Sequence, residues 1–223
     1  REVYKSYIKT RKKTRISPNQ GWNGATFSKT FSNYILHHSD ANTPEIISLC
    51  NNQGKVIRVL ENNSELQNRL TDFKLSPKEF FTLKCDNDQA LKAWQIKPLN
   101  FDIEKKYPVL MFVYGGPGSQ TVENKFGGRD FWYQMLAARG YWIISVDNRG
   151  TGARGRDFKK CTYLTLGKLE TEDQISAAKT LSRNTNIDSN RIGIWGWSYG
   201  GFMAANCIFK GSDIFKTAIS VAP

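Results

Sequence analysis

The feature that most constrains the fold is Gly196-Trp-Ser-Tyr-Gly-Gly, which joins a short apolar run to a helical pattern. Ile192–Trp195 predicts a strand before it, and small residues predict a helix after it as far as Lys210. The Gly-x-Ser-x-Gly spacing is typical of a sharp turn that presents a serine hydroxyl, here Ser198, at its apex. A glycine-lined core turn with a satisfied serine is the alternative. The strand before and the helix after favour a nucleophile.

The turn also predicts where negative charge would be stabilised. The backbone N–H of Tyr199 follows the serine and lies at the predicted N-terminal end of the helix. At that end the helix dipole favours negative charge, so this N–H is a candidate donor to an oxyanion.

A second glycine-rich stretch, Gly115-Gly-Pro-Gly, follows the apolar strand Val109–Tyr114. Its spacing is not that of a dinucleotide-binding loop. The end of a central strand is where the other half of an oxyanion hole is built, and we prefer this interpretation to a plain loop. Gly150-Thr-Gly-Ala-Arg-Gly lacks the Gly-Lys-Ser/Thr ending of a P-loop, which argues against phosphate binding there.

Composition indicates a folded globular protein, because 39% of the 223 residues are hydrophobic and six are tryptophan. No run approaches the roughly 18 apolar residues of a membrane-spanning helix, so we expect no membrane segment in the chain. The four cysteines show no Cys-x-x-Cys spacing, and we expect neither a metal site nor a cofactor. The two histidines, His37 and His38, are adjacent on a predicted strand and therefore point to opposite faces, which predicts structural roles.

The formal net charge of +12 is uneven, because residues 1–58 contain ten basic and three acidic residues. A basic cluster between Lys5 and Arg15, interrupted by Tyr7, would suit an arm that binds nucleic acid. A solvated hairpin explains the same residues, and no other part of the chain resembles a nucleic-acid module. We therefore predict a hairpin and no nucleic-acid partner.

Residues 1 to about 75 predict short antiparallel strands separated by turns, as in one or two blades of a β-propeller. The strands are expected at Val3–Ile8, Thr26–Phe27, Tyr34–His38, Glu45–Leu49 and Val56–Leu60. Asn23-Gly24 is among the expected turns. Residues 64–75 predict a helical connector, and a hairpin is expected from Phe80–Cys85 and Leu91–Ile96.

From Tyr107 onward, buried strands alternate with helices, which predicts a doubly wound parallel sheet. The expected elements after the strand at 109–114 are Phe131–Arg139, Tyr141–Val146, Lys168–Arg183, the serine turn with its flanking strand and helix, and Thr217–Val221. The acidic residues Glu170, Glu172 and Asp173 are expected in the first turn of the helix at 168–183, where they complement its dipole.

Three motifs in this order resemble the prolyl oligopeptidase family of serine peptidases, and its dipeptidyl peptidase IV-like branch in particular. They are Tyr114-Gly-Gly-Pro-Gly-Ser-Gln, Asp147-Asn-Arg-Gly-Thr-Gly and Gly196-Trp-Ser-Tyr-Gly-Gly. The resemblance implies a partial α/β-hydrolase doubly wound sheet over residues 76–223. It also implies an antiparallel segment from an incomplete β-propeller, a terminal blade, over residues 1–75.

The family resemblance also implies roles for individual residues. Ser198 resembles the acylating nucleophile, and the N–H of Tyr199 and the hydroxyl of Tyr114 resemble the two oxyanion donors. Asp147 and Arg149 fit an ion pair that fixes a loop near the active face. The implied activity is release of dipeptides after proline or alanine from a peptide N-terminus. An acylaminoacyl- or oligopeptidase, or a non-catalytic interaction protein that retains the fold, is the alternative.

The sequence departs from the family in one respect. In α/β-hydrolases an aspartate and then a histidine follow the serine, whereas only Asp213 and no histidine follow Ser198 here. We therefore expect an internal segment of a larger enzyme, nearly inactive alone, whose partner is the remainder of the same polypeptide. By family resemblance the parent would be extracytoplasmic and could form a homodimer.

Overall fold

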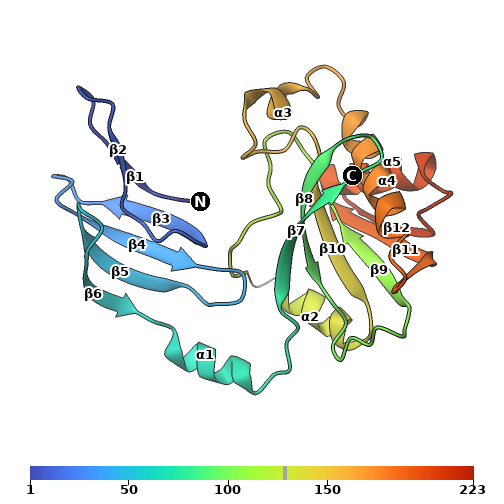
Figure 1. Ribbon diagram of the computed structural model, residues 1–223, viewed down its shortest axis with the longest axis horizontal. Coiled ribbons are helices and arrows are strands. Elements are labelled where there is room, and N and C mark those ends of the chain that lie inside the picture. The colour runs from blue at the N-terminus through green and yellow to red at the C-terminus, as the bar shows by residue number, and fades with distance from the viewer. Residues whose placement is uncertain (128–129) are drawn as a thin grey trace. The chain divides into compact units, whose positions relative to one another are not determined.

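Three β-sheets organise the chain in the computed structural model, which describes residues 1–127 and 130–223 (Figure 1). The sheets belong to two compact units. The first comprises Arg1–Leu75 with Glu123–Asp130, and the second comprises Ser76–Val122 with Phe131–Pro223.

The first unit begins with a two-stranded antiparallel hairpin of β1 (Tyr4–Ser6) and β2 (Lys13–Arg15). The hairpin is tied to the rest of the unit by the Ile16 carbonyl, which accepts a hydrogen bond from the Tyr34 hydroxyl. The basic residues of the predicted cluster lie on this hairpin and its loop, as the hairpin interpretation requires.

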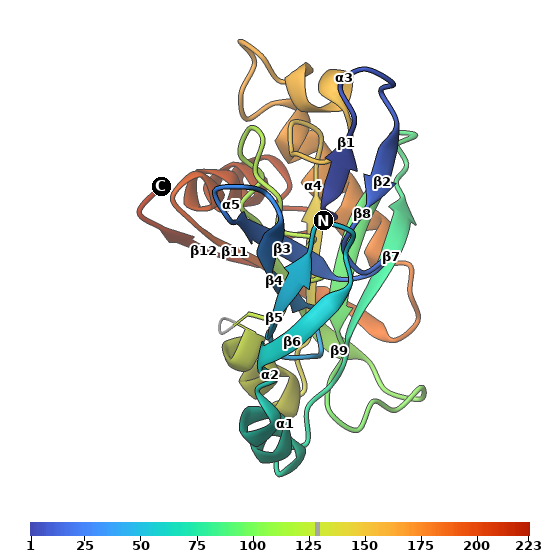
Figure 2. The ribbon, with the colours of Figure 1, turned by 90° about the vertical axis from the view of Figure 1, so that its left-hand side faces the viewer.

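The larger sheet of this unit contains four antiparallel strands in chain order, side by side in Figure 2. They are β3 (Trp22–Phe27), β4 (Asn33–Ser39), β5 (Ile46–Asn51) and β6 (Val56–Glu61). Tyr34, Leu36 and Cys50 from the two central strands form its buried core with Ile16. Such a meander has the architecture of one β-propeller blade.

The predicted turn at Asn23-Gly24 is wrong, because both residues lie inside β3, opposite His38 and His37 of β4. Asn23 is fully buried. Its Nδ2 donates to the Arg1 carbonyl at 2.8 Å, and its Oδ1 lies 2.9 Å from His38 Nδ1. Partners distant in sequence therefore satisfy the side chain that would otherwise favour a turn.

Helix α1 (Ser64–Thr71) leads out of this sheet and buries none of its residues. The second unit then builds a six-stranded sheet in the order β12-β11-β9-β10-β8-β7. Its strands are β7 (Lys78–Lys84), β8 (Ala90–Ile96), β9 (Tyr107–Phe112), β10 (Trp142–Asp147), β11 (Ile187–Trp197) and β12 (Thr217–Val221).

The sheet is mixed, because the predicted hairpin adds two antiparallel strands to the parallel strands that the sequence predicts from Tyr107 onward. β9, β10, β11 and β12 are parallel, as the alternation of strands and helices predicts. The hairpin β7–β8 joins the same sheet through antiparallel pairing of β8 with β10. The register of the β8–β10 pairing sets Ile143 opposite Ile96, and both of these side chains are buried.

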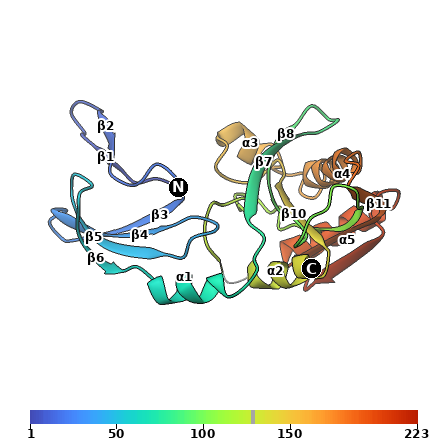
Figure 3. The same ribbon diagram turned by 60° about the horizontal axis from the view of Figure 1, so that its bottom comes forward.

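Helices cover both faces of this sheet (Figure 3). They are α2 (Asp130–Ala138), α4 (Leu169–Leu181) and α5 (Tyr199–Lys210), whereas the short α3 (Arg156–Lys160) buries none of its residues. On one face, Tyr133 and Ala137 of α2 pack with Phe112 and Ile143. On the other face, α4 and α5 pack on the main core with side chains such as Ala178. This is a doubly wound arrangement, and it brings the carboxyl ends of the parallel strands to one edge.

Candidate active site

Ser198 lies at the junction of β11 and α5 in a backbone conformation that is unusual for a residue with a side chain. Its φ is 56° and its ψ is −125°, and the residue is exposed. The serine N–H donates to the Val221 carbonyl of β12 at 2.9 Å, and its own carbonyl accepts from Phe202 N–H at 3.0 Å. Bonds on both sides thus hold the strained turn that exposes the hydroxyl.

The glycines around Ser198 are required by close backbone approach. A Cβ added to Gly196 would lie 2.3 Å from the Gly200 carbonyl oxygen, and one added to Gly200 would lie 2.2 Å from the Val113 oxygen. Since real Cβ atoms do not approach oxygen so closely, any other residue would push α5 away from β9 and β11.

Tyr114 and Tyr199 come together near the serine turn. Tyr114 lies just after β9, is exposed, and has its ring centroid 6.2 Å from that of Tyr199. The Tyr199 hydroxyl donates to Glu170 Oε1 of α4 at 3.0 Å. Burial and this carboxylate raise the pKa of the Tyr199 phenol, which keeps it protonated as a donor.

The loop after β9 is held by a buried amide. Gly115 has a φ of +73°, and its carbonyl accepts from Asn148 Nδ2 at 3.0 Å. Asn148 Oδ1 in turn accepts from Gln174 Nε2 of α4 at 2.9 Å. Both side chains are fully buried, so the loop that carries Tyr114 rests on the protein interior.

The expected ion pair between Asp147 and Arg149 is absent from the described residues. Asp147 instead accepts from the backbone N–H groups of Thr121 and Val122, at 2.9 and 3.1 Å. Arg149 binds Asp173, at 2.7 Å from a terminal nitrogen. The two side chains that the sequence suggested as a pair thus have separate partners on different segments.

Sequence reasoning missed the buried polar face of α4. Glu170, Asp173 and Gln174 are fully buried, whereas the sequence placed the acidic residues at a helix end as partners of its dipole. The three residues are spaced three and four apart and lie on the same side of α4 as Ala177 and Ala178. This spacing was the sequence signal that this face of the helix packs inward.

Other ionisable residues of interest have partners of their own. His37 Nδ1 lies 3.2 Å from Glu45 Oε2, and His38 bonds to Asn23 as described above. Asp213, the only acidic residue after Ser198, pairs with Lys179 at 2.8 Å. Among the described residues, no group of three or more His, Cys, Asp or Glu side chains could hold a metal ion. Among the residues that the structure describes, no helix is long and apolar enough to cross a bilayer.

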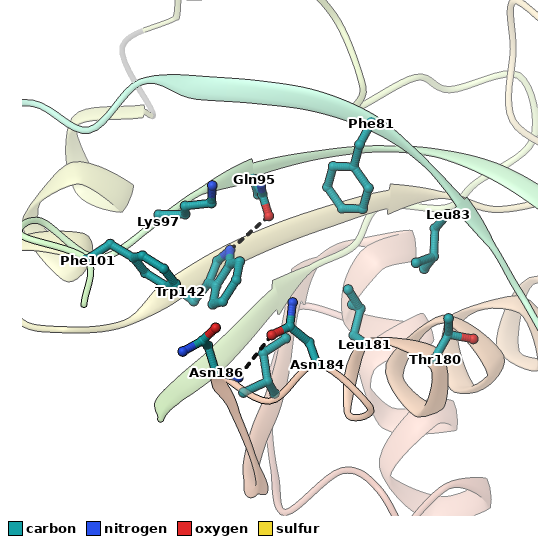
Figure 4. A pocket seen from close by; sticks show the side chains of 11 residues that line it. Phe81, Leu83, Gln95, Lys97, Phe101, Trp142, Thr180, Leu181, Asn184 and Asn186 are labelled. Atoms are coloured by element: carbon teal, nitrogen blue, oxygen red, sulfur yellow. Dashed lines mark hydrogen bonds between the residues drawn. The ribbon is translucent and has the colours of Figure 1, made fainter. Parts of the chain in front are cut away.

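Two of the hollows in the described part of the second unit have separate linings. One, of about 480 Å³, lies where the parallel strands begin and is lined by Trp142, Ile187 and Phe101; the Trp142 indole donates to Gln95 there (Figure 4). The other, of about 790 Å³, is lined by Pro117, three residues after Tyr114, and by Lys159, Lys160, Thr162, Tyr163, Leu164 and Leu166. None of the described residues that line this second hollow is Ser198, Tyr114 or Tyr199.

A doubly wound sheet with a strained serine turn between strand and helix defines an α/β-hydrolase fold. Comparison with known proteins agrees with this class. Residues 129–223 match the model of the prolyl oligopeptidase family. Dipeptidyl peptidase 4 of Trichophyton equinum is 39% identical over 203 residues, which cover 89% of this chain and 26% of that protein. Probable dipeptidyl peptidase 4 of Emericella nidulans is 37% identical over 202 residues, with the same two coverages.

Solved structures give the same result. Dipeptidyl peptidase 4 of Porphyromonas gingivalis superposes with a TM-score of 0.96 at 43% identity, over 100% of this chain and 31% of that one. A putative dipeptidyl aminopeptidase IV from Bacteroides ovatus gives 0.86 at 29% identity, over 96% and 31%. The chain is therefore similar to members of the prolyl oligopeptidase family, whose model its residues 129–223 match. It spans 26% of the length of the first curated relative.

Proposed function

We propose that this chain provides the nucleophile and the oxyanion hole of a serine peptidase that releases N-terminal Xaa-Pro or Xaa-Ala dipeptides. The observation that carries the proposal is the exposed Ser198 at a turn with positive φ, followed directly by Tyr199, whose ring centroid lies 6.2 Å from that of Tyr114. The preference for dipeptides is supported by the dipeptidyl peptidase 4 relatives, which share 37–39% of the aligned residues.

The mechanism follows from these positions. Ser198 Oγ attacks the carbonyl carbon of the scissile bond, its proton passes to a base, and the carbonyl oxygen becomes an oxyanion. The Tyr199 N–H and the Tyr114 hydroxyl donate to that oxygen and lower the barrier. The C–N bond then breaks, the amine leaves with a proton, and the dipeptide remains as an ester on Ser198 until water hydrolyses it.

The base is proposed to lie outside these 223 residues, because both histidines precede Ser198 and are bonded to Glu45 and Asn23. Loss of the base from a serine hydrolase lowers kcat by roughly 10⁶. The 223 residues alone are therefore proposed to be nearly inactive, and activity is to be measured on the full-length gene product.

The test uses a fluorophosphonate probe and chromogenic dipeptide substrates. The full-length protein is expected to react covalently with the probe at Ser198 and to release the chromophore from a Gly-Pro substrate. Ser198→Ala should abolish both signals, whereas Ser212→Ala, at an exposed position after α5, should change neither. A full-length protein that is not labelled by the probe is not a serine hydrolase, and this result would support the non-catalytic alternative.

The substrate preference is tested by comparing substrates with a free and an acetylated amino terminus. An N-acetylated Gly-Pro substrate should be cleaved poorly, since a dipeptidyl aminopeptidase requires a free amino terminus. Faster cleavage of the acetylated substrate would keep the acyl-enzyme on Ser198 but assign the protein to the acylaminoacyl- or oligopeptidase alternative.

A further inference from the structure

Helix α4 buries a row of polar side chains on the face that packs toward the serine site. Glu170 and Gln174 are both 0% exposed and are four residues apart, so they lie on the same side of the helix. Burial of a carboxylate and an amide is unfavourable unless hydrogen bonds compensate it. The partners of these two side chains therefore indicate why polar residues are present here.

Glu170 reaches the segment after the serine. Its Oε1 accepts from the Tyr199 hydroxyl at 3.0 Å, and its Oε2 is buried without a hydrogen-bond partner among the described residues. The Tyr199 ring also lies 3.2 Å from the place where a Cβ of Gly116 would be. The carboxylate thus fixes a ring at the start of α5 that lies against the loop after β9.

Gln174 is linked to the loop after β9 through the side chain of Asn148. Its Nε2 donates to Asn148 Oδ1 at 2.9 Å and to the Val146 carbonyl at 2.8 Å. Asn148 Nδ2 donates to the Gly115 carbonyl at 3.0 Å. One helix face is therefore bonded to both segments that carry the proposed oxyanion donors.

We propose that Glu170 and Gln174 are positioning residues that set the distance between the two oxyanion donors. They act through Tyr199 and Asn148 and not on the substrate. The inference rests on the proposed function, because it assigns the purpose of the two side chains to that reaction. The donors come from loops after two different strands, and a misplacement of about 1 Å can cost a hundredfold in rate. A third element bonded to both loops removes that freedom.

The experiment compares five variants of the full-length protein by steady-state kinetics on the Gly-Pro substrate. Glu170→Ala should lower kcat by about tenfold or more with KM changed less than about threefold, because an interaction used in the transition state is lost. Tyr199→Phe keeps the backbone N–H but loses the hydroxyl, and should lower kcat to a similar extent. Glu170→Gln should return kcat to within about threefold of wild type, because its amide oxygen still accepts from the phenol.

The matched control is Glu172→Ala, on the exposed side of the same helix, and its kcat should stay within about twofold of wild type. The double variant of Glu170→Ala and Tyr199→Phe should be no slower than either single variant, because both changes remove one hydrogen bond. That result and rescue by glutamine would not follow from a general loss of stability.

Three outcomes would overturn the proposal: full kcat in Tyr199→Phe, a change confined to KM in Glu170→Ala, or equal losses in the alanine and glutamine variants. If Glu170→Ala does not fold, the near-isosteric Tyr199→Phe decides alone. Wild-type protein that reacts with the probe while Tyr199→Phe keeps full kcat would refute only the positioning role. Wild-type protein without activity or labelling would refute the proposed function and the positioning role together.

Discussion

The guanidinium of Arg149 binds the carboxylate of Asp173 through two nitrogens, with Nε 3.0 Å and a terminal nitrogen 2.7 Å from Oδ1. Asp173 is fully buried and also accepts from the Arg149 backbone N–H at 2.8 Å and from Asn87 Nδ2 at 2.8 Å. One carboxylate therefore ties together the loop after β10, helix α4 and the turn between β7 and β8. The bond raises the pKa of Arg149, which is expected for a guanidinium held by a buried anion.

Removal of this carboxylate should be strongly destabilising. Asp173→Ala leaves Arg149 and Asn87 without their partner, and we expect a loss of about 3–5 kcal/mol in the free energy of unfolding. Glu172→Ala is the control, because Glu172 is half exposed and lies 3.6 Å from the same guanidinium, so its loss should be under about 1 kcal/mol. Urea unfolding of both variants beside wild type measures the difference. Equal midpoints for the two variants would contradict a structural role of the buried pair.

The hydroxyl of Tyr114 should contribute to the chemical step. Tyr114→Phe is expected to lower kcat on the Gly-Pro substrate by about a hundredfold or more, as loss of one oxyanion donor does elsewhere. The stability of the fold should hardly change, because the ring is exposed and the change removes one oxygen. Tyr141→Phe, at a similarly exposed position just before β10, is the matched control. An unchanged kcat in Tyr114→Phe would assign the second donor to another group.

Much of the second unit could be predicted because its signals are local. The serine turn needs glycine at positions that the chain itself brings into contact, so its sequence pattern is short and specific. Val109–Tyr114 and Tyr141–Val146 are apolar runs because both faces of β9 and β10 are covered by helices. These runs and the serine turn are enough to predict the parallel, doubly wound part of the sheet and the position of Ser198 on it.

The remaining features depend on partners far apart in sequence. Arg149 has an aspartate two residues before it, yet it binds Asp173, 24 residues later, while Asp147 is held by the backbone of Thr121. Asn23 has a strong local preference for a turn, which its bonds to Arg1 and His38 override. Neither pairing has a sequence pattern that distinguishes it from the local alternative, so only the folded chain reveals it.

The close approach of α5 to the sheet makes Gly200 difficult to replace. Gly200→Ala would place a Cβ 2.2 Å from the Val113 oxygen, so helix and strand must separate. We expect a loss of at least about 1–3 kcal/mol in stability and a slower reaction of Ser198 with a fluorophosphonate. Gly24→Ala is the control, since its Cβ would meet only His37 Cβ at 3.7 Å. A Gly200→Ala protein with normal stability and labelling rate would show that the serine turn tolerates a wider spacing between α5 and the sheet.

The buried carboxyl of Asp147 should make stability depend on pH. The direction is opposite to that of an ordinary ion-paired carboxylate, because its contribution to stability is lost as pH rises. The side chain is buried at the end of β10, and burial raises its pKa above the ordinary value of 3.8 although Thr121 and Val122 donate to it. The folded state therefore binds the proton more tightly than the unfolded state does. Its contribution to stability is fully present below the unfolded pKa and is lost as pH rises through the folded pKa.

Asp147→Asn removes this titration while it keeps an oxygen that can accept from Thr121. The amide nitrogen would face the Val122 N–H, which adds a cost of about 1 kcal/mol that does not vary with pH. The free energy of unfolding of wild type minus that of the variant should therefore fall as pH increases from about 3 to about 7. Urea midpoints measured at several pH values in this range give that difference. If it stays constant or rises with pH, burial does not raise the pKa of Asp147, and its hydrogen bonds from Thr121 and Val122 outweigh desolvation.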